Sequence, residues 1–297
     1  MVVGRRSRAA LAEPAGDDVN APADPPMVGL AEWRLPSSGA GALRLAAQAG
    51  ADGMQVEFGG PGRGEWADAP GRVAVLREAA SAANVRLLAV AGNVLNDVGL
   101  PAPPGGPAET RVRRLLTRLL DTARDLGVPL AFVPSFRRSA IDGPIAFTRT
   151  ARALAWAARE AHARGLVLAS ENVLPEAAAC RLVATVASPA FRLVLDTFNP
   201  VGAGLDPAGL TAGLAPALAD QVHVKDGPPA TGDTPPLGRG QGRLDATLAV
   251  LGRHRVPVRA LVLENDYRGG REHLIAADLA WARTAAARHG LSGSPAR

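Results

Sequence analysis

Short runs of apolar residues alternate along the chain with longer stretches in which apolar residues recur every three or four positions. The first pattern is typical of buried β-strands and the second of amphipathic helices. Eight runs have strand length, at 27–32, 53–58, 85–91, 130–134, 166–170, 192–196, 221–225 and 260–264. A helical stretch follows each of them, at 42–48, 71–83, 108–126, 145–164, 175–186, 206–217, 244–254 and 270–289.

Strands that alternate with helices form parallel βαβ units, because each helix carries the chain back along the sheet. Eight such units, with no glycine-rich phosphate turn after the first strand, favour a closed barrel over a doubly wound sheet. Gly50 and Gly127 stand where a left-handed residue would end a helix. We therefore predict a single (β/α)8 TIM barrel over residues 27–290, the fold for which about 250 residues are typical.

The two ends of the chain lack this periodicity. Segment 1–26 is rich in Ala, Pro, Asp and Gly, and we predict a disordered N-terminal leader there. Segment 291–297 is predicted to be a tail.

Composition narrows the class of protein. A hydrophobic share of 47% suits a globular enzyme with a large core, and aromatics of only 4% mean that aliphatic residues must fill it. The net charge of +5 and pI of about 10.7 would also suit a nucleic-acid-binding protein. The basic residues are spread along the chain, however, and Lys225 is the only lysine. A compositional bias towards arginine therefore explains the charge better than a binding patch.

The same reasoning bears on location. Cys180 is the only cysteine, so no intramolecular disulfide can form. No apolar run reaches the roughly 18 residues that indicate a membrane span, and the first residues lack the apolar stretch of a signal peptide. We therefore expect a cytoplasmic protein that binds neither membrane nor nucleic acid.

Four successive predicted strands, the fifth to the eighth, end in an ionisable residue. Functional side chains of a (β/α)8 barrel lie where strands end, and a buried carboxylate is costly unless it is paired or binds metal. One such residue alone could cap a helix or fill the core. Four on consecutive strands predict a site for one divalent ion, Mn²⁺, Mg²⁺, Co²⁺ or Zn²⁺. The ligands would be Glu171, Asp196, His223 and Glu264.

Five short motifs of the second half resemble the xylose-isomerase-like barrel superfamily over about residues 166–265. That group includes sugar isomerases and epimerases related to tagatose 3-epimerase, the inosose dehydratases, hydroxypyruvate isomerase and endonuclease IV. The His-x-Lys-Asp element followed by Gly-x-Gly is the most specific piece. The motifs are Ser170-Glu171-Asn172, Leu195-Asp196-Thr197-Phe198, His223-Val224-Lys225-Asp226, Gly240-Gln241-Gly242-Arg243-Leu244-Asp245 and Leu263-Glu264.

The resemblance implies that the four strand-end residues are metal ligands and that Glu171 and Glu264 are also an acid–base pair. A metal on adjacent oxygens of a hydroxy-ketone acidifies the neighbouring C–H, and a carboxylate can then take the proton. Action on one carbon gives epimerisation, transfer between carbons gives isomerisation, and loss of a β-hydroxyl gives dehydration. We expect a metal-dependent sugar, keto-sugar or polyol isomerase or epimerase acting by enolisation. A dehydratase or lyase of the inosose dehydratase type is the alternative.

Polar residues next to these ligands are further candidates. Lys225 could stabilise negative charge on a substrate oxygen, or it could pair with Asp226 or Glu264. Asp226 could bind substrate, although it could also orient His223 or Lys225. Asn199 stands where the superfamily's epimerases usually carry histidine. Asparagine can bind a substrate hydroxyl but cannot shuttle a proton, which disfavours a standard ketose 3-epimerase.

Three other segments are candidates for binding substrate. Glu57 ends the second strand, as a residue common in the superfamily does, and is expected to bind a hydroxyl. Glycines at 238–242 could cradle a phosphate, with added charge from Arg239, or could form a tight turn into the next helix. Arg137 and Arg138 follow the fourth strand and could hold an acid or phosphate, or could be surface residues.

Two other functions are less favoured. An endonuclease of the endonuclease IV type needs further histidines in its first half, whereas all histidines here except His223 fall in predicted helices. A barrel that only binds a ligand would not need both Glu171 and Glu264. The expected partner is a small sugar or polyol, and a homo-oligomer is left open.

Overall fold

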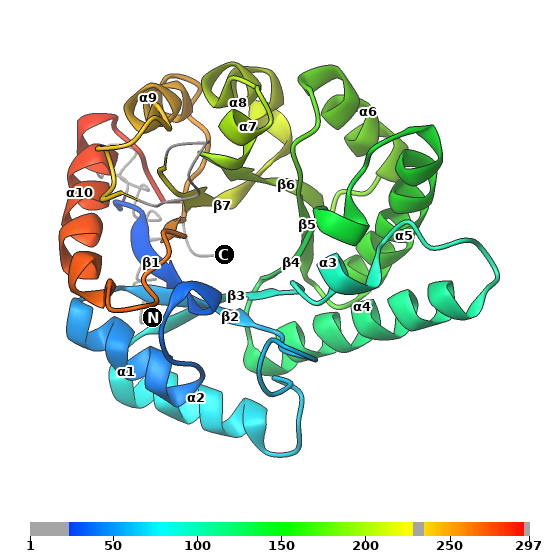
Figure 1. Cartoon of the computed structure of the whole chain (residues 1–297), viewed down its shortest axis with the longest axis horizontal. Coiled ribbons are helices and arrows are strands. Elements are labelled where there is room, and N and C mark those ends of the chain that lie inside the picture. Colours follow the sequence, from blue (N-terminus) through cyan, green and yellow to red (C-terminus); the bar gives the residue numbers. More distant parts are fainter. Residues whose placement is uncertain (1–23, 228–234, 294–297) are drawn as a thin grey trace, which may run out of the picture.

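Residues 24–227 and 235–293 are described by a computed structural model, in which eight parallel strands close into a barrel in chain order (Figure 1). Pairing of β1 with β8 closes the ring. The predicted (β/α)8 barrel is therefore confirmed. Its strands are β1 (Met27–Ala31), β2 (Gly53–Glu57), β3 (Arg86–Ala91), β4 (Leu130–Pro134), β5 (Val167–Glu171), β6 (Phe191–Asp196), β7 (Leu218–Val224) and β8 (Ala260–Leu263).

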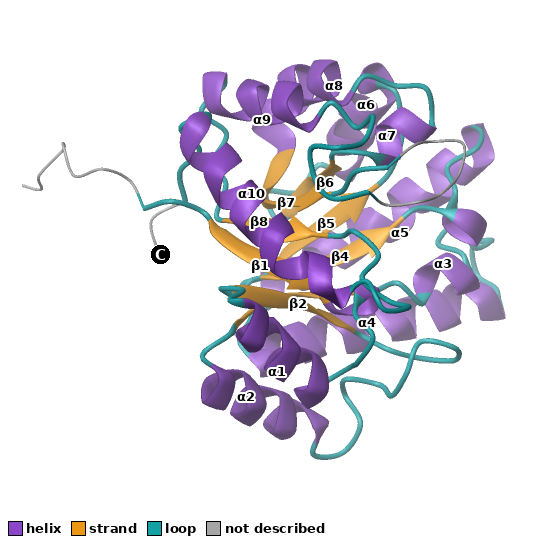
Figure 2. Cartoon of the chain, turned by 60° about the vertical axis from the view of Figure 1, so that its left-hand side comes forward, coloured by secondary structure: helices purple, strands orange, loops and turns teal. Residues whose placement is uncertain are grey.

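Helices surround the strands on the outside (Figure 2). The main ones, which follow the strands in turn, are α1 (Ala40–Ala49), α2 (Arg72–Ala83), α4 (Pro107–Leu126), α5 (Pro144–Ala163), α6 (Glu176–Val186), α8 (Pro207–Leu214), α9 (Leu244–Arg253) and α10 (Ile275–Arg288). Shorter helices occupy the connections, namely α3 (Leu95–Val98), α7 (Asn199–Gly202) and the 3₁₀ turns Glu32–Arg34, Arg137–Ser139, Ala215–Ala217 and Glu272–Leu274.

Local sequence sets where several helices begin and end. Pro107 and Pro144 occupy the first turn of α4 and α5, where a missing N–H costs nothing. Gly50 and Gly127 follow α1 and α4 with φ of 83° and 72°, left-handed values that glycine adopts without strain. The predicted glycine ends of these two helices are confirmed.

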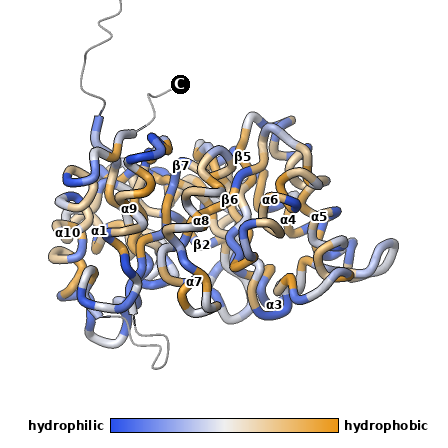
Figure 3. The backbone as a smooth tube through the Cα atoms, turned by 90° about the horizontal axis from the view of Figure 1, so that it is seen from above, coloured by the Kyte–Doolittle hydropathy of each residue, from blue (hydrophilic) through white to orange (hydrophobic). Residues whose placement is uncertain are grey.

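The helices bury one face against the barrel. Along α4, Leu116, Leu119, Leu120 and Ala123 are fully buried, whereas residues between them are polar. Figure 3 shows the resulting alternation of hydrophobic and hydrophilic stretches along the outer helices. The strands differ, since they are covered on both faces and read as nearly continuous apolar runs.

One irregularity of the barrel has a consequence for its interior. The pairing of β2 with β3 shifts between Met54 and Gln55, so that Leu88 has no partner in the ladder. Its side chain fills the space beside Gly29 and Gly53, where an added Cβ would lie only 2.7 and 2.8 Å from Leu88 carbons. These two glycines therefore make room for the bulged residue.

Residues near the two ends of the described chain contact each other beside the barrel. Val258 N donates to Ser292 O at 3.0 Å, and Gly293 N donates to Asp24 O at 2.7 Å. Leu291, the first residue of the predicted tail, is buried. Most of the predicted leader, 1–23, and the last residues, 294–297, lie outside the described residues.

Candidate metal centre

The four predicted ligands come together at one rim of the barrel. Glu171 and Asp196 end β5 and β6, His223 lies one residue before the end of β7, and Glu264 follows β8. Parallel strands present their C-terminal ends at the same rim, and Asp196 is paired directly with His223. One ligand atom from each residue lies within 4.8 Å of the other three, and all four residues are buried.

One oxygen of Glu264 is held by donors while the other faces the cluster. Oε1 accepts hydrogen bonds from Trp33 Nε1 at 3.0 Å and from Arg34 Nε and Nη2 at 3.1 and 2.8 Å. Oε2 is buried without a hydrogen-bond partner and lies 3.4 Å from His223 Nδ1. The segment after β1 thus fixes the carboxylate and turns Oε2 towards the other ligands.

Asp196 and Glu171 are arranged in the same way. Asp196 Oδ1 accepts from the backbone N–H of Phe198 at 2.7 Å and of Asn199 at 2.5 Å, whereas Oδ2 is buried without a partner. Glu171 Oε1 accepts from Asn199 Nδ2 at 2.7 Å, and its Oε2 lies 3.5 Å from His223 Nδ1. Each carboxylate therefore has one anchored oxygen and one that faces inward.

These inward-facing atoms fit a divalent cation. Asp196 Oδ2, His223 Nδ1 and Glu264 Oε2 are all buried and lack a hydrogen-bond partner. A buried lone pair without a donor is costly, and three such atoms around one point need a shared partner. Three carboxylates and one imidazole form the oxygen and nitrogen set that hard or borderline divalent ions prefer.

Burial and crowding of charge shift the pKa of His223, Asp196 and Glu264. Burial disfavours a charged His223, but Glu171 and Glu264 raise its pKa to about 10. Burial raises the pKa of Asp196 to about 7, against the pull of Lys225. Burial also opposes ionisation of Glu264, but Lys225 and Arg34 hold its pKa well below the usual range. Positive charge at the centre therefore stabilises the cluster, and a divalent cation supplies two charges where a proton supplies one.

His223 is supported from below by two residues that the sequence analysis missed. Its Nε2 lies 2.9 Å from Gln55 Oε1, and Gln55 Nε2 donates to Gln221 Oε1 at 2.9 Å. All three side chains are fully buried inside the barrel. The signal available in the sequence was weak, since it consists of single glutamines within otherwise apolar strands.

A cavity of about 610 Å³ opens over the cluster. Glu171 and Glu264 line it together with Asn199, Lys225 and Arg34. This volume is within the roughly 300–1,000 Å³ of small-molecule sites. The cavity therefore gives a ligand direct access to the two glutamates.

Lys225 and Asn199 form a polar wall of this cavity. Lys225 Nζ donates to Asn199 Oδ1 at 3.2 Å, and Asn199 Nδ2 donates to Glu171. The hydrogen bond of the Lys225 ammonium group goes to Asn199, and its charge also acts on Glu264, whose pKa it lowers. Asn199 therefore connects the only lysine of the chain to one of the ligands.

Asp226 lies away from the cavity, under the glycine loop. Its carboxylate accepts four backbone N–H groups, those of Gly227, Gly238, Gly240 and Gly242, at 2.9 to 3.0 Å. The loop N–H groups that could have cradled a phosphate are thus taken by the chain's own carboxylate, and the tight-turn alternative holds.

The structure therefore separates two predicted residues from the cluster. The hydrogen bonds of the Asp226 carboxylate go to the loop, so it is not directed at the substrate, His223 or Lys225. Arg239 is exposed on the same loop and lines neither of the cavities described here.

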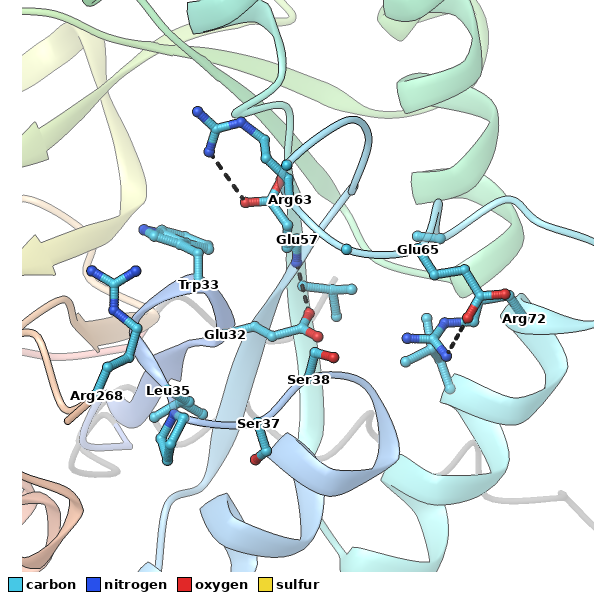
Figure 4. Close-up of a pocket in the computed structure, with 16 residues that line it drawn as sticks. Glu32, Trp33, Leu35, Ser37, Ser38, Glu57, Arg63, Glu65, Arg72 and Arg268 are labelled. Carbon is cyan, nitrogen blue, oxygen red and sulfur yellow. Dashed lines mark hydrogen bonds and ion pairs between the residues drawn. The ribbon is translucent and has the colours of Figure 1, made fainter. Parts of the chain in front are cut away.

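Glu57 lies in a neighbouring cavity of about 360 Å³ (Figure 4). Burial raises its pKa to about 7, although Asn93, which donates to Oε2 at 2.8 Å, and Arg63, 4.0 Å away, oppose the shift. Glu32 accepts from the backbone N–H of Glu57 and of Gly39, and so ties the loop after β1 to β2. Trp33 lines both this cavity and the one over the ligand cluster.

Comparisons with known proteins agree on one group. A family model described as xylose isomerase-like TIM barrel matches residues 43–285. The chain is 61% identical over 259 residues to a 2-epi-5-epi-valiolone 7-phosphate 2-epimerase of an Actinoplanes species, which covers 87% of this chain and 94% of the relative.

Solved structures match the fold at low identity. An L-ribulose 3-epimerase superposes with a TM-score of 0.71 at 19% identity, covering 89% of this chain and 95% of that one. A xylose isomerase domain protein from Planctomyces limnophilus gives 0.72 at 17% identity, covering 89% and 98%. In the described part of the chain, no helix is both long and apolar enough to cross a membrane.

Proposed function

Because this chain belongs to the xylose isomerase-like TIM barrel family, we propose that it is a divalent-metal-dependent epimerase of a phosphorylated polyhydroxy ketone. The observation that carries the proposal is the set of inward-facing, unpartnered ligand atoms beneath a substrate-sized cavity. The relative that is 61% identical supplies the chemical class, a ketone with a phosphate at position 7 and inversion at carbon 2.

Two of the sequence predictions are confirmed by the comparisons. The resemblance to the xylose-isomerase-like superfamily is confirmed, and so is an enzyme of the isomerase class. Asn199, in place of the expected histidine, argued against a ketose 3-epimerase. That argument is consistent with a relative whose activity is at carbon 2.

In this proposal Glu171, Asp196, His223 and Glu264 hold one divalent ion. When bound, the ion polarises the substrate carbonyl and makes the neighbouring C–H more acidic. The Oε2 atoms of the two glutamates face His223, whereas the Oε1 atoms contact Asn199 and Arg34, which line the cavity. Both glutamates line the cavity, so their carboxylates are placed to move a proton on a bound substrate.

The protein side of the reaction follows from these contacts. The carboxylate of one glutamate takes the proton from carbon 2, and the carboxyl group of the other returns a proton to the opposite face of the planar enolate. Lys225 offers its ammonium group to the negative charge that develops on the substrate oxygen. Asn199 keeps Lys225 and Glu171 in place and can donate to a substrate hydroxyl. Glu57, in the adjoining cavity, is proposed to bind another hydroxyl.

The proposal is tested with 2-epi-5-epi-valiolone 7-phosphate in D₂O with Mn²⁺ added. We expect inversion at carbon 2 with one deuterium incorporated there, because the proton returns from a group that exchanges with solvent. Proton NMR follows both events in one sample. Loss of water from the substrate would favour the dehydratase alternative. Absence of both exchange and inversion with the metal-loaded protein would contradict the proposal.

A further inference from the structure

The cavity over the metal centre has an excess of positive charge. Three carboxylates line it, and the cations are Arg34, Arg63, Arg137, Lys225 and Arg268. Arg34 and Lys225 belong to the centre itself. Arg268 forms two bonds to Asp266, with Nε at 2.7 Å and Nη2 at 2.8 Å, and is thereby neutralised. The surplus therefore lies with Arg63 and Arg137.

Arg63 and Arg137, which both line the cavity, share the carboxylate of Asp97. Arg63 Nε donates to Asp97 Oδ2 at 2.7 Å, and Arg137 Nη2 lies 3.1 Å from Asp97 Oδ1. Arg63 also lies 4.0 Å from Glu57, so the two guanidinium groups face two carboxyl groups. Each guanidinium still keeps further N–H groups that can bind an anion. Arg63, Asp97 and Arg137 follow β2, β3 and β4, whereas Lys225 follows β7. The arginine pair and Lys225 therefore stand on opposite sides of the ring of strands.

The backbone holds Arg137 in this place. Its φ is 50°, a left-handed value that is costly for a residue with a side chain. The preceding N–H, of Phe136, donates to Asn96 Oδ1 at 2.8 Å. Arg138, the next residue, is exposed and lines neither cavity.

We propose that Arg63 and Arg137 bind the phosphate group of the substrate, with Asp97 bridging the two guanidinium groups. This inference rests on the proposed function. Planar guanidinium groups bind phosphate through paired N–H groups, and both residues lie in the same cavity as Glu171 and Glu264. The glycine loop is no competitor, because Asp226 already occupies its N–H groups.

The test compares 2-epi-5-epi-valiolone 7-phosphate with its dephosphorylated form. Arg137→Gln is expected to raise KM for the phosphate ester by about tenfold or more, the effect of losing a charge-assisted hydrogen bond. It should leave kcat/KM for the free ketone within about twofold. Arg63→Gln should act alike, whereas Asp97→Asn, which removes a competing negative charge, should lower KM for the ester. Arg138→Gln is the matched control and should change neither value.

The possible failures can be told apart. If the wild type inverts neither compound, the proposed function fails. If the wild type uses both but Arg137→Gln and Arg63→Gln leave their ratio of kcat/KM unchanged, only the phosphate site fails. Inhibition by inorganic phosphate provides a second measurement, since its inhibition constant should rise in Arg137→Gln and stay at the wild-type value in Arg138→Gln.

A row of buried amides beneath His223 carries a second, independent inference. Gln221 Nε2 donates to the backbone carbonyl of Leu88 at 2.9 Å, Gln55 Nε2 donates to Gln221 Oε1, and Gln55 Oε1 faces His223 Nε2. The Leu88 carbonyl belongs to the bulged residue that has no partner in the β2–β3 ladder. A carbonyl can only accept, so it sets the direction of every bond in the row.

The geometry assigns to Gln55 and Gln221 the task of fixing the tautomer of His223. Because Gln55 presents its oxygen, His223 Nε2 must carry the hydrogen, which leaves the lone pair of a neutral ring on Nδ1. Nδ1 is the ring atom that faces Glu171 and Glu264. Both glutamines are therefore positioning residues, which prepare Nδ1 to bind the metal.

Metal affinity measures this role without any substrate. Gln55→Met, of similar volume but with only a weak thioether acceptor, is expected to weaken Mn²⁺ or Co²⁺ binding by about 10- to 100-fold in chelator competition. Gln55→Glu keeps an acceptor for Nε2–H and should restore the affinity to within about threefold. The visible absorption spectrum of the Co²⁺ protein should change in Gln55→Met and return in Gln55→Glu.

The pair of variants separates positioning from stability. If Gln55→Met binds Mn²⁺ as tightly as the wild type and its Co²⁺ spectrum is unchanged, the role is merely structural and the inference is wrong. Should that variant not fold, Gln221→Met, which releases the amide of Gln55 from the direction set by Leu88, is measured in the same way. Undiminished affinity in that variant would overturn the inference equally.

Discussion

Glu264→Gln is expected to abolish epimerisation while the barrel stays folded. Glutamine has nearly the same shape, and its carbonyl oxygen can still accept from Trp33 and Arg34, but it cannot take up a proton. A general base contributes about 10²- to 10⁴-fold to a rate, so kcat should fall by at least that much. The measurement is turnover of the ketone phosphate at saturating Mn²⁺, which compensates for weaker metal binding.

Deuterium exchange makes this prediction sharper. If Glu171 and Glu264 act on opposite faces of one carbon, each glutamine variant should still exchange the carbon 2 proton of one epimer without inverting it. The two variants should differ in which epimer exchanges. Inversion at an undiminished rate in Glu264→Gln would remove Glu264 from the acid–base pair. Glu78→Gln, on the exposed face of α2, is the matched control and should keep the wild-type rate.

Removal of the metal is expected to abolish turnover and to lower Tm. A ligand that binds only the native state stabilises it by about 2.7 kcal/mol at 100 times its Kd. At about 2–4 °C per kcal/mol for a chain of this size, chelation should lower Tm by about 5–10 °C. Calorimetry before and after EDTA treatment measures the loss. Addition of Mn²⁺, Mg²⁺, Co²⁺ and Zn²⁺ in turn then ranks the ions.

Asp196→Asn is the control for this experiment. It removes one ligand charge while keeping a carbonyl oxygen for the backbone N–H groups of Phe198 and Asn199. Its Tm should therefore respond much less to Mn²⁺ than that of the wild type. A protein shown by elemental analysis to be free of metal, yet with undiminished turnover and Tm, would contradict the metal-dependent reading of the site.

The barrel could be predicted because its signals are local. Strand and helix differ in the period of their apolar residues, and Gly50 and Gly127 mark helix ends through a backbone preference that no distant contact changes. The ligand cluster could be predicted one step later. Once the fold is a closed parallel barrel, Asp196 and His223 must meet at one rim, although neither sequence segment specifies the other.

The glycine loop shows where such reasoning stops. Its three glycines are consistent with a phosphate cradle and also with a tight turn into the next helix. In the structure the loop is a turn, because its N–H groups already donate to the carboxylate of Asp226. The sequence does not distinguish the two alternatives, because the outcome depends on the direction of the Asp226 side chain.

By itself, then, the sequence determined a (β/α)8 barrel with four ionisable residues at successive strand ends. Only the tertiary structure decided what surrounds them. Trp33 holds Glu264 across 231 positions of sequence, and Gln55 supports His223 across 168. Arg63 and Arg137 meet at Asp97 from separate loops. Periodicity records which face of an element is buried, but contacts of this kind depend on register, rotamer and loop path, which arise only when the ring of strands has closed.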